Sequence, residues 1–153
     1  MHDFFYRPAD GWAADFIPFY DEKADVFRLY YLKDYRDVPA HGEGTPWFQI
    51  TTDDCMRFSE LGETIPRGAH DAQDLYVFTG SALYTEGQYH IFYTGHNPHY
   101  PADGRPQEGV LHAVSADGVL FEKTNEAPIF APDGYEKDDW RDPFVYFNKD
   151  EGC

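Results

Sequence analysis

The chain repeats part of its own pattern after 63 residues, and this repeat constrains the fold more than any other feature. Laying residues 48–66 over residues 111–128 aligns pairs that are each 63 apart: Thr52 with Ser115, Asp54 with Asp117, and Phe58 with Phe121. A third copy begins at Asp142. Repeats of roughly 40–50 residues or more that consist of short strands are typical of β-propeller blades. The 153 residues therefore predict about two and a half blades.

Short strands separated by tight turns fill each unit, and no amphipathic helical pattern of ten or more residues occurs. The turns carry Asp or Gly, which tight backbone dihedrals favour. The predicted strands cover residues 16–20, 26–32, 47–52, 58–61, 75–84, 89–93, 109–115 and 120–123. We therefore predict an all-β fold, a partial propeller of four-stranded antiparallel blades. A single domain over residues 1–153 would comprise units at about 15–74 and 75–140, and an incomplete unit at 141–153 that ends in a turn.

The composition of the chain limits the classes of molecule that it is expected to bind. The formal net charge of −16 disfavours nucleic acid and anionic membranes, whereas a neutral sugar is not repelled. Hydrophobic residues make up 42% of the chain and aromatic residues 18%, which indicates a folded globule. Neither a signal peptide nor an apolar run of about 18 residues is visible, so we expect a cytoplasmic protein. Cys55 and Cys153 have neither metal-site spacing nor a disulfide framework, and no cofactor is expected.

Two acids occupy matching places in the first and third units. Asp15 and Asp142 each precede the predicted first strand of a unit and lie 127 residues apart, close to two repeats. In a propeller the first strand lines the central channel, so the two carboxylates would converge at one mouth. Convergent carboxylates perform glycoside hydrolysis. The alternative is structural, because an Asp before a strand often only bonds its own backbone in a turn.

Other side chains near this mouth suit ligand binding. In the middle unit, Thr79 and Ser81 offer hydroxyl groups at the matching location. Trp47 and Trp140 lie beside the predicted channel strands and connections, where an indole ring stacks on a sugar or fills the core. His96 and His99 have near-ligand spacing, but solvated loop histidines are the favoured interpretation, so no metal site is expected.

Four segments resemble glycoside hydrolase family 32, the family of invertases, inulinases and fructanases. Arg141-Asp142-Pro143 resembles its Arg-Asp-Pro motif. Residues 78–82 resemble its Phe-Ser-Gly-Ser segment, and residues 92–95 resemble its Phe-Tyr-Thr-Gly strand. Asp15 lies where the family has its Asn-Asp-Pro-Asn-Gly nucleophile motif, although the flanking residues differ.

The resemblance implies a five-bladed propeller that hydrolyses terminal fructosides with retention. Asp15 would be the nucleophile, Asp142 would hold sugar hydroxyls and stabilise the transition state, and Arg141 would help fix Asp142. The family's acid/base glutamate stands in a later Glu-Cys-Pro motif, and only 11 residues follow Asp142, so we expect that glutamate to be absent. Glu136 is the nearby alternative. We thus expect a truncated enzyme of the β-fructofuranosidase type, or a non-catalytic carbohydrate-binding or assembly module.

The incomplete third unit leaves strand edges open. Exposed edges pair with other chains, and two copies of two and a half blades would total five. The sequence therefore predicts a homodimer that closes one propeller around a fructoside. The alternative is that the chain is a fragment of a longer enzyme.

Overall fold

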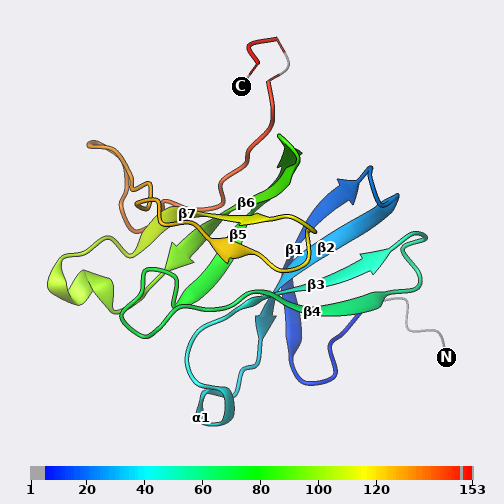
Figure 1. Ribbon diagram of the computed structural model, residues 1–153. Coiled ribbons are helices and arrows are strands. Elements are labelled where there is room, and N and C mark those ends of the chain that lie inside the picture. The colour runs from blue at the N-terminus through cyan, green and yellow to red at the C-terminus, as the bar shows by residue number, and fades with distance from the viewer. Residues whose placement is uncertain (1–5, 149, 153) are drawn as a thin grey trace.

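The computed structural model describes residues 6–148 and 150–152 and has two four-stranded antiparallel sheets with identical strand order (Figure 1). The first sheet comprises β1 (Trp12–Asp21), β2 (Val26–Asp34), β3 (Trp47–Thr52) and β4 (Ser59–Ile65). The second comprises β5 (Tyr76–Thr85), β6 (Gln88–His96), β7 (Glu108–Ser115) and β8 (Glu122–Lys123). The all-β prediction and the two blade-like units are confirmed.

Helical structure is confined to the long connections. The helix α1 (Val38–His41) lies between β2 and β3, and the 3₁₀ turn η1 (Tyr100–Asp103) lies between β6 and β7. Each contains a proline near its start, which suits the first helical turn because proline lacks the amide hydrogen. Of the described helices, none has the length and apolar character needed to span a bilayer.

The 63-residue repeat holds at the level of single hydrogen bonds. After β3, the hydroxyl of Thr52 accepts a bond from the amide of Cys55 at 2.8 Å. After β7, the hydroxyl of Ser115 accepts the matching bond from the amide of Gly118 at 3.0 Å. Cys55 and Gly118 both have positive φ, 55° and 72°. Residues one repeat apart therefore adopt the same turn.

The core lies between the two sheets, and Trp47 is at its centre. Its indole is fully buried and stacks on Tyr30 at a centroid separation of 6.2 Å, while Tyr93 approaches from the second sheet at 6.3 Å. The expectation that Trp47 binds substrate is therefore wrong, because every face of the ring is covered by protein. Further buried members of this core come from both sheets: Ile17, Leu32, Ile65, Val77, Tyr89, Ile91, Ala113 and Phe121.

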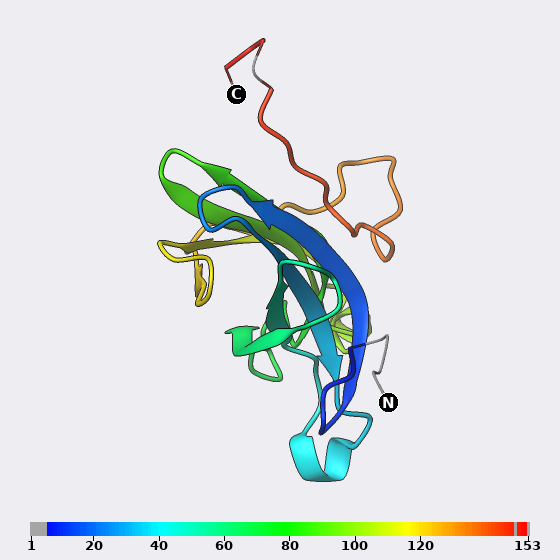
Figure 2. The same cartoon turned by 90° about the vertical axis from the view of Figure 1, so that its right-hand side faces the viewer.

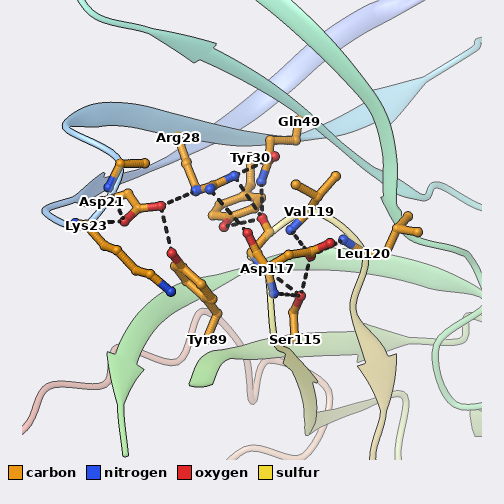
Figure 3. A network of polar contacts seen from close by, with 12 residues as sticks. Asp21, Lys23, Arg28, Tyr30, Gln49, Tyr89, Ser115, Asp117, Val119 and Leu120 are labelled. Carbon is orange, nitrogen blue, oxygen red and sulfur yellow. Dashed lines mark hydrogen bonds and ion pairs between the residues drawn. The ribbon is translucent and has the colours of Figure 1, made fainter. Parts of the chain in front are cut away.

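A buried polar network joins the sheets (Figure 3). The Arg28 guanidinium on β2 donates to Asp21 at 2.7 Å, and the Tyr89 hydroxyl on β6 donates to the same Asp21 oxygen at 2.8 Å. Arg28 and Gln49 also donate to the carbonyl of Gly118, at 3.3 Å and 2.7 Å. Side chains of the first sheet thus hold the β7–β8 turn of the second.

The third unit does not form a strand. Residues 142–147, predicted as its first strand, belong to neither sheet, and Figures 1 and 2 show them as an unpaired trace that runs toward the C-terminus. An inner blade strand pairs with the second strand of its own blade, and residues 6–148 and 150–152 offer no such strand to it. The predicted turn is present, since the Gly152 amide donates to the Asn148 carbonyl at 2.8 Å. The homodimer that would complete this unit stays a prediction. The last residue of the predicted turn, Cys153, lies outside the described residues.

Arg28→Met should destabilise the fold strongly, because it leaves the Asp21 carboxylate buried without its cation. Removing one partner of a buried pair costs about 3–5 kcal/mol. Urea unfolding followed by tryptophan fluorescence measures the change. The control is Arg57→Met, which breaks an ion pair to Asp54 whose arginine side chain is 85% exposed and whose loss should therefore change the free energy of unfolding far less. Equal effects of the two changes would contradict the assigned role of the network.

Lowering the pH should remove the contribution of Asp21 to the free energy of unfolding. Burial disfavours its charged form, but the bonds from Arg28 and Tyr89 outweigh burial and hold the pKa of Asp21 below its ordinary value. A depressed carboxyl pKa stabilises the fold above the unfolded-state value of about 3.9 and ceases to do so as pH falls through the folded-state value. The difference in unfolding free energy between the parent chain and Asp21→Asn should therefore shrink between about pH 6 and about pH 2. A constant difference would contradict this.

Candidate active site

A cavity of about 380 Å³ opens where β1, β5 and the segment after Trp140 meet. We call it the carboxylate pocket. Its lining comprises two aspartates, an arginine, a hydroxyl and two apolar side chains: Asp15, Asp142, Arg141, Thr79, Leu32 and Phe78. The structure thus brings together four of the residues that the sequence predicted for a site, while their chemical roles stay predictions.

Asp15 occupies a bulge inside β1, not the entry to the strand as predicted. The pairing of β1 with β2 shifts between Ala14 and Ile17, and Asp15 has a φ of 43°. Aspartate is among the residues that tolerate positive φ, and bulges of this kind redirect a side chain. The bulge therefore lets Asp15 line the carboxylate pocket from within a paired strand.

Thr79 lies at the matching irregularity of β5. The pairing with β6 shifts between Phe78 and Gly80, and Thr79 is the extra residue. Its hydroxyl donates to the Asp15 carboxylate at 2.8 Å. Since Thr79 stands 64 residues after Asp15 and 63 before Asp142, the repeat places three equivalent positions at one mouth.

A hydrogen bond to its backbone amide fixes the position of Asp142. Its amide donates to the hydroxyl of Thr94, a buried residue of β6, at 2.8 Å, and its φ is 58°. Three residues on, the Val145 amide donates to the hydroxyl of Ser81 at 3.0 Å. Ser81 is itself buried and does not line the carboxylate pocket. The expectation that Ser81 binds substrate is therefore corrected: its hydroxyl fixes the segment that carries Asp142.

Arg141 is fixed at the edge of the pocket by two acids. Its guanidinium lies 2.6 Å from a carboxylate oxygen of Asp139 and 3.4 Å from one of Glu108. Glu108 is fully buried and also lies 3.1 Å from His96 Nδ1. The His96 ring stacks on Phe78, a lining residue, at a centroid separation of 4.4 Å. The pocket wall therefore continues into a buried polar group.

The sequence analysis missed Glu108, and it interpreted His96 as a solvated loop residue although His96 ends β6 with its side chain only 13% exposed. Burial raises the pKa of Glu108, although the bond with His96 and the charge of Arg141 oppose the rise. Its second oxygen, Oε2, lacks a hydrogen-bond partner among the described residues. His96 and Glu108 face each other across β6 and β7. The predicted strands, at 89–93 and 109–115, ended short of both residues, so the pairing that would have revealed them was not visible.

The remaining candidates lie outside the pocket. The Trp140 ring meets Tyr135 edge to face at 5.9 Å and is not a lining residue. The Glu136 carboxylate accepts bonds from the amides of Lys137 and Asp138, at 2.9 Å and 3.2 Å, so it caps its own turn. Neither side chain reaches the carboxylates in this arrangement.

Comparisons with known proteins identify the family of the chain. The sequence model described as the Glycosyl hydrolases family 32 N-terminal domain matches residues 5–153. The chain therefore belongs to glycosyl hydrolase family 32. A search of curated proteins gave no match.

Solved structures give the same fold. A beta-fructofuranosidase from Schwanniomyces occidentalis matches with a TM-score of 0.74 and 21% identity, covering 96% of this chain and 29% of that one. A family 32 beta-fructofuranosidase from Bombyx mori matches with 0.72 and 26%, covering 94% and 29%. An exo-inulinase from Aspergillus awamori matches with 0.73 and 20%, covering 96% and 32%. The chain thus spans about a third of these structures, and the partial five-bladed propeller is confirmed.

Thr94→Val should loosen the Asp142 backbone without disturbing β6, because valine nearly matches threonine in shape but cannot accept the Asp142 amide. A lost hydrogen bond of about 1 kcal/mol corresponds to a roughly fivefold change in the opening equilibrium. Hydrogen exchange should therefore be about fivefold faster at the Asp142 amide. Ser81→Ala is the control and should act mainly on the Val145 amide. An unchanged Asp142 amide in Thr94→Val would refute this tether.

Proposed function

We propose that this chain supplies the fructoside-binding part of a retaining glycosidase site, with Asp15 as the nucleophile and Asp142 as the group that holds sugar hydroxyls. The observation that supports the proposal is the convergence of both aspartates on one pocket in a member of family 32. Two similar structures, both of the enzyme from Schwanniomyces occidentalis, are complexes with fructosyl-erythritol and with fructosylnystose. A fructosyl unit is therefore the ligand that we assign to the carboxylate pocket.

In this proposal the reaction has two steps. The Asp15 carboxylate attacks the anomeric carbon of the fructosyl unit, the glycosidic C–O bond breaks, and the leaving oxygen takes a proton from a general acid. Water, which gives a proton to the conjugate base of that acid, then attacks the anomeric carbon, breaks its bond to the Asp15 oxygen, releases fructose and restores the carboxylate. The Thr79 hydroxyl, bonded to Oδ2 of Asp15, leaves the other oxygen of that carboxylate for the attack.

The partners of Asp142 suit a binding role. Its side chain is exposed to the cavity while the Thr94 bond holds its amide. A carboxylate that accepts bonds from two sugar hydroxyls orients the ring, and its charge stabilises the oxocarbenium-like transition state. Arg141, which is bonded to two other acids, adds a fixed positive charge at the edge of the same pocket.

A second candidate is a carbohydrate-binding module without catalysis. The observation in its favour is that the carboxylates lining the pocket, among residues 6–148 and 150–152, are Asp15 and Asp142 alone. A general acid typically contributes about 10²- to 10⁴-fold in rate. The two candidates therefore differ in turnover and agree in sugar binding.

A substrate with a good leaving group tests the role of the nucleophile independently of the general acid. In an aryl β-fructofuranoside made from an acidic phenol, the phenolate leaves without being protonated. The chain should therefore release phenol and form a fructosyl adduct that intact-mass spectrometry detects. Asp15→Asn should lower the rate by at least about 10³-fold and abolish the adduct. Asp142→Asn should weaken both binding and rate by about 10²-fold. Asparagine tolerates positive φ, so both variants should fold.

The control is Asp133→Asn, an exposed acid outside the pocket, which should leave the rate unchanged. Full activity in Asp15→Asn would refute its role as nucleophile. Fructose binding that depends on Asp142, without any release or adduct, would favour the binding module. A folded chain that neither binds fructose nor releases phenol would overturn both candidates.

A further inference from the structure

Three side chains from separate connections meet away from the carboxylate pocket. Glu43 lies between β2 and β3, His70 between β4 and β5, and His99 between β6 and β7. One ligand atom from each lies within 4.8 Å of the other two. We propose that these residues form a binding site for a divalent transition-metal ion such as Zn²⁺. We call the three residues the rim triad.

The separations in the rim triad suit a small ion. His99 Nε2 lies 3.0 Å from each carboxylate oxygen of Glu43, and His70 Nε2 lies 3.8 Å from the nearer one. Zinc binds histidine nitrogen and carboxylate oxygen at about 2.0–2.2 Å, so tetrahedral ligand atoms stand about 3.4 Å apart. The two separations from Glu43 bracket that value, and the ligand nitrogens of the two histidines lie within 4.8 Å of each other, so modest side-chain rotations would bring all three ligand atoms to the ion.

The two imidazoles are already aligned. Their rings stack at a centroid separation of 4.5 Å with an interplanar angle of 24°, and both Nε2 atoms face Glu43. Two histidines and one carboxylate are a common zinc ligand set that leaves a fourth position for water. The side chains of His70 and His99 are 72% and 45% exposed, so an ion can enter from solvent.

A buried side chain fixes the two histidine loops to each other. Asn97 is fully buried, and its Oδ1 accepts a bond from the His99 amide at 3.0 Å. Its Nδ2 donates to the carbonyls of His70 and Ala72, at 3.0 Å and 2.7 Å. One residue therefore sets the backbone positions of both histidines of the rim triad.

The loop that carries Glu43 is fixed in a similar way. The Arg67 guanidinium donates to the carbonyls of His41, Gly42 and Gly44 on either side of Glu43. Gly44 has a φ of 99°, and a Cβ there would stand 2.1 Å from the Leu75 carbonyl. Only glycine permits so close an approach, so the loop is held tightly against the start of β5.

Glu43 also has an outer partner of the kind that metal ligands use. The Tyr76 hydroxyl donates to Oε1 of Glu43 at 3.2 Å. Such outer hydrogen bonds orient a ligand carboxylate, and their loss typically costs 10- to 100-fold in metal affinity. A simple surface ion pair needs none of this bracing.

Isothermal titration of the metal-stripped 153-residue chain with ZnCl₂ tests the proposal. We expect one equivalent to bind, with affinity reduced at least about tenfold in both His70→Ala and His99→Ala. The matched control is His41→Ala, an exposed histidine of the same region whose side chain is outside the rim triad and which should bind zinc as the parent does. Far-ultraviolet circular dichroism confirms that each variant is folded.

Two further measurements keep the test decisive. Glu43→Gln preserves an acceptor for Tyr76 but removes the charge, so it should weaken zinc binding without lowering the melting temperature of the metal-free chain. Zinc should raise the melting temperature of the parent and of His41→Ala but not of His99→Ala. The proposal is overturned if the folded parent binds no zinc, or if His99→Ala binds it as the parent does. Loss of binding in His112→Ala alone would also overturn it, because that residue pairs with His90 elsewhere.

Discussion

The relative placement of the two sheets depends on the hydrogen bonds that Arg28 and Gln49 donate to the carbonyl of Gly118. Apolar burial between the sheets is strong but not directional, whereas these bonds fix one turn of the second sheet against the middle of the first. Because β1 and β5 then lie against each other, the hydroxyl of Thr79 comes within bonding distance of Asp15. The pocket is thus a consequence of how two blades dock, and neither blade alone contains it.

The fold was accessible from the sequence because a repeat transfers information from one unit to the next. The turn at Cys55 predicts the turn at Gly118, and the structure gives both the same hydrogen bond. Strand lengths were underpredicted where alternation is weak: β6 extends to His96, through a glycine that a pattern-based prediction treats as a break. The strand predicted for the third unit is absent, because residues 142–147 have the apolar, aromatic composition of a strand but no pairing partner within the described chain.

The candidate site was accessible only in part. Asp15 and Asp142 were found because the repeat marks equivalent positions, but a repeat does not say which way a side chain points. Ser81 was therefore assigned to the ligand although its hydroxyl holds the Val145 amide. Glu108 was missed because one buried acid among 28 has no signature in a single sequence. Contacts between loops, such as those that unite the rim triad, have no periodicity at all and emerge only from the folded chain.

The positive φ of Asp15 and Asp142, 43° and 58°, has an evolutionary consequence. At such a backbone position aspartate and asparagine are tolerated, while β-branched residues are strained. Thr79, which is β-branched, occupies its own bulge without a positive φ. In a descendant of this chain, a single exchange of Asp15 or Asp142 to asparagine can therefore remove the carboxylate charge and keep the same backbone conformation. Conversely, drift toward valine or threonine at these positions is opposed by conformational strain even where selection for chemistry has ceased.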